Sequence, residues 1–232
     1  MALYCQINIE SLRGIHQDAF RHSIQIDWNQ SQSTAQINRF RGNYSHHSRQ
    51  DNRDSFIITR YQTATLDNTV FANDGMLHVR RMSRWTQTRW LEGFGQYQFQ
   101  NFAELDQRVL FGGGIRKEGS RNRYGIIITF GTGIMHEYEQ YTGYAPTQLV
   151  RSTSYLSLQR TVGNIQLSST NYYQPRLDAL SDYRILSQST IDYTLSEQVY
   201  LSFFFNLLFK SVVPDTIERL EQDTGMTIGI RF

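Results

Sequence analysis

The segment VYLSFFFNLLFK, residues 199–210, alternates in a way that predicts a β-strand, and its composition indicates which kind of sheet contains it. Successive side chains of a strand point to opposite faces. One face therefore carries Val199, Leu201, Phe203, Phe205, Leu207 and Phe209. Exposed to water, so dense an apolar face would be strongly adhesive. The segment favours a strand whose apolar face meets lipid over a strand of a soluble sandwich.

Similar alternating segments recur along the whole chain, separated by polar breaks. The last is TGMTIGIRF, residues 224–232, in which Met226, Ile228, Ile230 and Phe232 share a face. The segments have about 9–13 residues, longer than the usual strand of about 5–6 and suited to a tilted strand that crosses a bilayer. We predict an all-β fold: a closed antiparallel transmembrane β-barrel of about 12 strands, with short periplasmic turns and longer extracellular loops. Residues 1–232 form one domain, with 1–18 as an N-terminal periplasmic segment or partial strand and 19–232 as the barrel.

Composition narrows the class of protein further. The chain has 232 residues and a net charge of +2, too small to indicate a nucleic-acid partner. The sequence has no apolar run long enough for a transmembrane helix. The single cysteine, Cys5, excludes an internal disulfide and a cysteine-based metal site. No cofactor is expected.

The polar breaks predict the orientation. With an even number of strands, both termini lie on one side, and the breaks on that side are shorter on average. We therefore expect both termini in the periplasm of a bacterial outer membrane. Aromatic residues near predicted strand ends suit interfacial girdles: they are Trp28, Trp85, Trp90, Tyr124, Tyr173, Tyr183, Tyr193 and Phe232. A terminal Phe232 after alternating apolar residues resembles the signal read by the outer-membrane barrel assembly machinery, which we expect as a partner together with outer-membrane lipid, lipopolysaccharide and other envelope proteins.

Three stretches resemble one known family. They are INIESLRG (residues 7–14), WLEGFGQYQFQNFAELDQRVLFGGGIRKEG (residues 90–119) and SEQVYLSFFFNLLFKSVVPD with the terminal TGMTIGIRF. The order of these segments is similar to that of the salt-induced outer-membrane protein family, a bacterial outer-membrane β-barrel domain of unknown function. The resemblance implies the same fold and location, and it implies no reaction.

The polar faces of the strands are predicted to line the barrel interior, because charges facing lipid would be costly. The lumen-lining candidates are Arg60, His78, Arg80, Glu92, Gln96, Gln98, Arg108, Arg116, Arg151, Gln159, Arg184, Asp192, Asn206, Lys210, Glu221 and Asp223. The lipid-facing candidates are Leu201, Phe203, Phe205, Leu207, Phe209, Ile228 and Ile230. Opposite charges inside either neutralise one another in a structural network or form a narrow polar pore that favours anions.

Other patterns carry weaker chemical hypotheses. The paired histidines of SHHS (residues 45–48) are expected in a solvated turn without an acidic partner. His136, with Glu137 and Glu139 close by in the sequence, could bind a divalent ion weakly. The glycine runs GFG and FGGGI lack the helix that a phosphate loop needs, and they indicate close packing, curvature or a bulge in a strand. We therefore expect no catalytic, cofactor-binding or metal residues.

The sequence favours a non-enzymatic integral outer-membrane barrel that serves as an envelope component or a narrow polar channel. Alternatives are a barrel subunit of a larger outer-membrane complex, a membrane-embedded lipid hydrolase and a soluble ligand-binding barrel. A hydrolase would need a nucleophile and a base within hydrogen-bond reach, which spacing alone does not specify.

Overall fold

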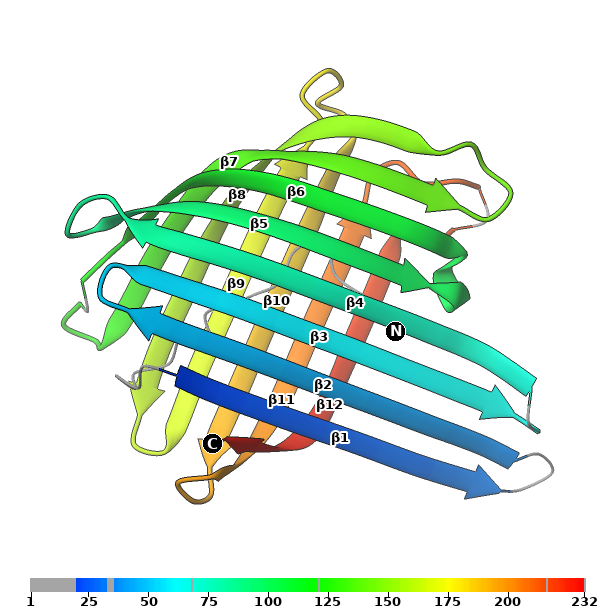
Figure 1. Ribbon diagram of the computed structural model, residues 1–232, viewed down its shortest axis with the longest axis horizontal. Coiled ribbons are helices and arrows are strands. Elements are labelled where there is room, and N and C mark those ends of the chain that lie inside the picture. The colour runs from blue at the N-terminus through cyan, green and yellow to red at the C-terminus, as the bar shows by residue number, and fades with distance from the viewer. Residues whose placement is uncertain (1–19, 33–35, 68, 121, 216, 232) are drawn as a thin grey trace.

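The structure is a computed structural model that describes residues 20–32, 36–67, 69–120, 122–215 and 217–231. The described residues form twelve strands and one short 3₁₀ helix (Figure 1). The elements are β1 (Phe20–Gln32), β2 (Gln36–Gln50), β3 (Arg53–Leu66), β4 (Thr69–Arg84), β5 (Arg89–Gln100), η1 (Asn101–Ala103), β6 (Leu105–Glu118), β7 (Ile126–Tyr141), β8 (Thr147–Val162), β9 (Ile165–Pro175), β10 (Tyr183–Thr194), β11 (Val199–Lys210) and β12 (Leu220–Arg231).

Each strand pairs antiparallel with the next in the sequence, and β12 returns to β1 to close a barrel. The predicted all-β barrel of about 12 strands is therefore confirmed. Closure joins the first and last strands, whose edges would otherwise be free along their whole length. Within the described residues, β1 and β12 pair at Ser23 with Arg231 and at Ile24 with Ile230. Beyond these two pairs the strands diverge (Figure 1).

The two ends of the barrel carry different connections. We call the end where β1 begins and β12 stops the terminal end, and the opposite one the far end. The β4–β5 and β6–β7 connections lie at the terminal end, whereas η1 and the β9–β10 and β11–β12 connections lie at the far end (Figure 1). The longest connection, residues 211–219, is at the far end.

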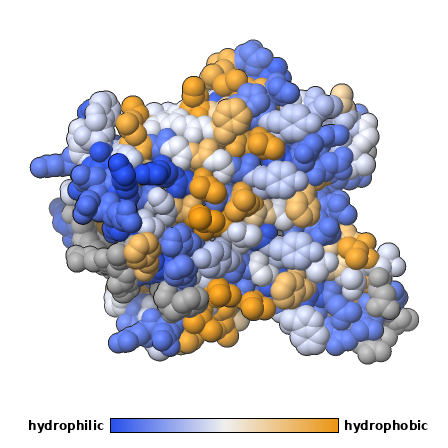
Figure 2. Space-filling model, in the orientation of Figure 1, coloured by the Kyte–Doolittle hydropathy of each residue, from blue (hydrophilic) through white to orange (hydrophobic). Residues whose placement is uncertain are grey.

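Alternation places apolar side chains outside and most polar ones inside. Ile228 is 62% exposed on the outer surface, and on β11 Phe203 and Phe205 are exposed while Lys210 and Asn206 are buried. Figure 2 shows hydrophobic residues over the middle of the wall and many hydrophilic ones towards its ends. The outer surface is therefore apolar where a soluble protein would be polar.

The interior also contains apolar clusters that the sequence analysis did not predict. One consists of Phe56, Ile58, Met76, Met82 and Trp90, and the other of Tyr155, Tyr172, Leu186 and Leu208. Both lie on inner-face positions of neighbouring strands. The inside is thus a mixed core and not a uniformly polar lining.

Two sequence-based placements are wrong. SHHS is not a turn, because it lies within β2, where His46 faces outward and His47 inward. His47 also has an acidic neighbour, since its Nε2 lies 3.7 Å from an Asp54 carboxylate oxygen. Trp90 is not interfacial: it is 3% exposed, and its indole nitrogen donates to a Glu118 carboxylate oxygen at 3.0 Å.

Glycines let inner aromatic rings lie flat against the wall. A Cβ built at Gly131 would lie 2.2 Å from a ring carbon of Tyr155, and one at Gly229 would lie 2.3 Å from the ring of Tyr200. The hydroxyl of Tyr200 then reaches Ser23 and Gln25 of β1, each at 2.9 Å. Small residues on one strand thus make room for large ones on the next.

In the part of the chain that the structure describes, we find no helix with the length and apolar character needed to cross a membrane.

Candidate functional site: a buried ion network inside the barrel

The polar residues predicted to line the lumen lie on the inner faces of their strands. Arg60 is half-buried, as are Gln159, Glu221 and Asp223. The others are buried: His78, Arg80, Glu92, Gln96, Gln98, Arg108, Arg116, Arg151, Arg184, Asp192, Asn206 and Lys210. Whether they line a conducting lumen stays a prediction.

Glu137 of β7 is the centre of an ion network towards the far end of the barrel. Its side chain is fully buried. One carboxylate oxygen accepts a hydrogen bond from Nε of Arg108 at 2.6 Å, and the other accepts one from Nε of Arg151 at 2.7 Å. Arg184 of β10 also donates to Glu137. Three guanidinium groups from three strands thus converge on one carboxylate.

Glu139, two residues farther along β7, extends this network. It accepts a hydrogen bond from Arg184 at 2.7 Å and one from the Tyr141 hydroxyl at 3.2 Å. Lys210 of β11 in turn donates to Tyr141 at 3.4 Å and to Glu221 of β12 at 2.8 Å. Strands β7, β10, β11 and β12 are therefore joined by side chains as well as by the sheet.

The network balances its charges. Arg151 donates to Asp182, the last residue before β10, at 2.9 Å. The cations Arg108, Arg151, Arg184 and Lys210 face the anions Glu137, Glu139, Asp182 and Glu221. Buried charges are tolerated when they are paired and hydrogen-bonded. We call these eight residues the Glu137 network.

Another buried cation, Arg80, lies closer to the terminal end, and fewer of its hydrogen-bonding groups have partners than in the Glu137 network. Arg80 of β4 is 1% exposed, and among the described residues none of its three guanidinium nitrogens has a hydrogen-bond partner. Its nearest carboxylate oxygen, on Glu92, is 3.6 Å away, and its guanidinium lies 5.4 Å from the centre of the Phe94 ring. Glu92 accepts a hydrogen bond from the Tyr155 hydroxyl at 3.1 Å. We call Arg80, Glu92, Phe94 and Tyr155 the Arg80 layer.

Several of these contacts join strands that are not neighbours in the sheet. Tyr155 of β8 reaches Glu92 of β5, and Arg184 of β10 reaches Glu139 of β7. Such contacts cross the interior of the barrel at two levels. Chemically, the arrangement pairs and immobilises charge inside the barrel.

The structure does not bring together the proposed metal-binding trio of His136, Glu137 and Glu139. His136 faces outward and stacks on Phe111 at 4.9 Å between ring centres, whereas Glu137 and Glu139 face inward. The proposed metal trio is therefore split between two faces of β7. Among the described residues, no group of three or more histidine, cysteine or acidic side chains could hold a metal ion.

Sequence reasoning missed the central role of Glu137 and Glu139, and it missed the inner aromatic Tyr155. Glu137 and Glu139 share the alternation of Met135 and Tyr141, the inner face of β7. That parity could have placed Glu137 and Glu139 inside the barrel from the sequence alone. The convergence of Arg184 was not, because Arg184 and Glu137 are 47 residues apart and meet across the barrel.

Similarity to known proteins lies in the fold and not in the sequence. No protein-family model and no curated protein matches the chain. The resemblance to the salt-induced outer-membrane family therefore has no match to a family model behind it.

Among solved structures, the translocator domain of the autotransporter NalP from Neisseria meningitidis is similar at 8% identity and a TM-score of 0.55. The match covers 97% of this chain and 92% of that one. The NanC porin is similar at 11% identity and a TM-score of 0.51, over 92% of this chain and 98% of that one. At such identities the similarity establishes the barrel fold alone.

Proposed function

We propose that the protein is an integral barrel of a bacterial outer membrane and a non-enzymatic component of the envelope. One observation carries the proposal: along single strands, apolar side chains are exposed outside while charged ones are buried inside. On β11, Phe203 and Phe205 are exposed whereas Lys210 is buried. Water would be a poor solvent for the outer surface, and hydrocarbon a good one.

The comparisons support this proposal through the fold. The translocator domain and the porin are similar to this chain over almost its whole length. The resemblance to the salt-induced outer-membrane family points to the same location. Both termini in the periplasm, contact with lipopolysaccharide and insertion by the barrel assembly machinery belong to the same proposal. Phe232, the expected assembly signal, lies outside the described residues, as does the 1–18 segment.

A narrow anion-favouring channel is the second candidate function. It is favoured by the similarity to a porin and by the incompletely paired Arg80. The contacts across the interior oppose steady conduction, because ions would have to displace the hydrogen bonds of Tyr155 and Arg184. We therefore propose an occluded resting state, from which any channel would open by separating these contacts.

Three measurements test the proposal. We expect the protein to stay in membranes after a carbonate wash and to migrate differently on a gel before and after heating. A protein that is monodisperse without detergent would contradict the membrane location. In planar bilayers we expect purified protein to remain closed, and steady conductance would contradict the occluded state while leaving the membrane location intact.

A further inference from the structure

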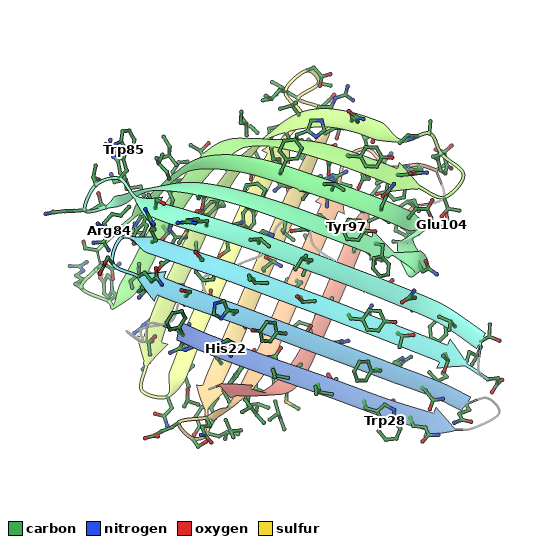
Figure 3. The ribbon with its side chains drawn as sticks, in the orientation of Figure 1. His22, Trp28, Arg84, Trp85, Tyr97 and Glu104 are labelled. Atoms are coloured by element: carbon green, nitrogen blue, oxygen red, sulfur yellow. The ribbon has the colours of Figure 1, made fainter. Side chains whose placement is uncertain are left out.

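The outer wall at the terminal end carries an unusual group of cations. Figure 3 labels Trp85 there, and Figure 2 shows hydrophilic side chains gathered over the same part of the wall. We call the group the basic rim; its members are Arg53, Arg81, Arg89 and Lys117, all exposed. They come from four adjacent strands, β3 to β6.

The described part of the chain provides no counterion for the basic rim. Within the described residues, none of its four members makes an ion pair with a carboxylate. The nearby Glu118 already binds Arg116 at 3.0 Å and Trp90 at 3.0 Å. The charge is therefore available to an external anion.

The strand register brings two of these cations face to face. Arg89 of β5 is directly opposite Lys117 of β6. Like charges in directly opposed positions destabilise a sheet unless an anion lies between or above them. The pair costs stability in isolation, and an anionic ligand would remove that cost.

The neighbours of the pair indicate what kind of anion fits. Trp85, which pairs with Arg89 through a 2.9 Å backbone hydrogen bond, and Phe130, opposite Lys117, are both exposed. The next outer row towards the middle of the barrel contains the exposed Leu91 and Ile115, which pair with each other. The cations thus lie where an apolar belt ends, between two aromatic rings. This is the environment of lipid headgroups.

Arg81 is the member of the basic rim that lies nearer the middle of the barrel, on the same outer face and opposite Gly93. A Cβ built at Gly93 would have only one neighbouring atom within 4 Å, a backbone oxygen at 3.9 Å. The open surface leaves room for the Arg81 side chain to extend along the wall towards the headgroup level, as long basic side chains do near membranes.

We infer that the basic rim binds the phosphate headgroup of an anionic glycerophospholipid in the leaflet at the terminal end. The acyl chains lie along the apolar belt, the phosphate lies over Arg89 and Lys117, and Trp85 packs at the level of the glycerol. The site presupposes the membrane location proposed above.

Native mass spectrometry of the detergent-solubilised full chain tests the site with three probes: phosphatidylglycerol, phosphatidylcholine with the same acyl chains, and lipid A. We expect the wild type to prefer phosphatidylglycerol. Each basic residue at an anionic surface contributes about fivefold in affinity, so R89Q/K117Q should bind phosphatidylglycerol about 25-fold more weakly. The control R160Q/R219Q removes two exposed cations outside the basic rim and should leave the affinity unchanged.

Several outcomes would overturn the site. These are equal binding of phosphatidylcholine, an unchanged affinity in R89Q/K117Q with intact heat-modifiable migration, or an equal loss in R160Q/R219Q. Loss of lipid A binding alone would assign the basic rim to the other leaflet. A wild type that needs no detergent would instead refute the membrane proposal, which is a separate result.

Discussion

The Glu137 network and the Arg80 layer lie inside the same barrel, yet they treat buried charge in opposite ways. Glu137 accepts hydrogen bonds from three arginines, and its neighbours continue the pairing to Lys210 and Glu221. Arg80 is as deeply buried, but it has one carboxylate at 3.6 Å and no hydrogen-bond partner among the described residues.

This difference shows what the Glu137 network and the Arg80 layer each contribute to stability. A fully paired cluster fixes the relative positions of its strands, because breaking any one bond leaves a buried charge alone. An incompletely paired cation contributes little to stability, so the Arg80 layer is where the interior can rearrange at the lowest cost. We therefore expect the interior to rearrange more easily at the Arg80 layer than at the Glu137 network.

The largest expected effect comes from breaking the Glu137 network. Glu137→Gln leaves three arginines without their shared charge, and removing one partner of a buried ion pair costs about 3–5 kcal/mol. We expect that loss in the free energy of unfolding, measured by denaturant titration in detergent. Glu197→Gln, in the exposed β10–β11 turn, is the matched control. A loss below about 1 kcal/mol in the network variant would show that it does not hold the strands together.

Neutralising the charges of the Arg80 layer should not lower the stability of the barrel, in contrast to Glu137→Gln. Replacing a poorly satisfied buried pair by neutral groups is often neutral or stabilising by about 1–4 kcal/mol. We therefore expect R80M/E92Q to unfold at the same or a higher denaturant concentration than the wild type. The single variant Glu92→Gln, which leaves Arg80 without a counterion, should be less stable than the double variant. If the double variant is less stable than Glu92→Gln, the Arg80 layer stabilises the barrel as the Glu137 network does, and the contrast between them is wrong.

The smallest effect concerns an ion pair outside the membrane, in the β9–β10 connection. The pKa of the Asp178 carboxyl lies below its ordinary value of 3.8, chiefly because Arg176 donates hydrogen bonds to it. A lowered carboxyl pKa stabilises the fold above pH 3.8, and this contribution disappears as the pH falls through the folded value. Asp178→Asn should therefore lower the thermal midpoint slightly at pH 7 and less at pH 3. An equal shift at both pH values would indicate that the charge is irrelevant.

The candidate site was only partly predictable. Alternation alone predicts the face of a strand on which a residue lies, and in the structure Arg80, Arg108 and Arg184 are buried. The partners were not predictable, because Arg184 meets Glu137 across three strand pairings and Tyr155 meets Glu92 from strands that are not neighbours. Trp90 was misplaced because position near a strand end indicates depth and not side.

By itself the sequence determined the class of fold, the approximate number of strands and the face of most strand residues. Each of these follows from a period of two and from segment length, which are local properties of the chain. Which charges pair, which aromatic rings enter the interior and where cations gather on the outer wall were decided by the tertiary structure. These depend on register and closure, because only the closed barrel brings residues far apart in the sequence within a few ångströms of one another.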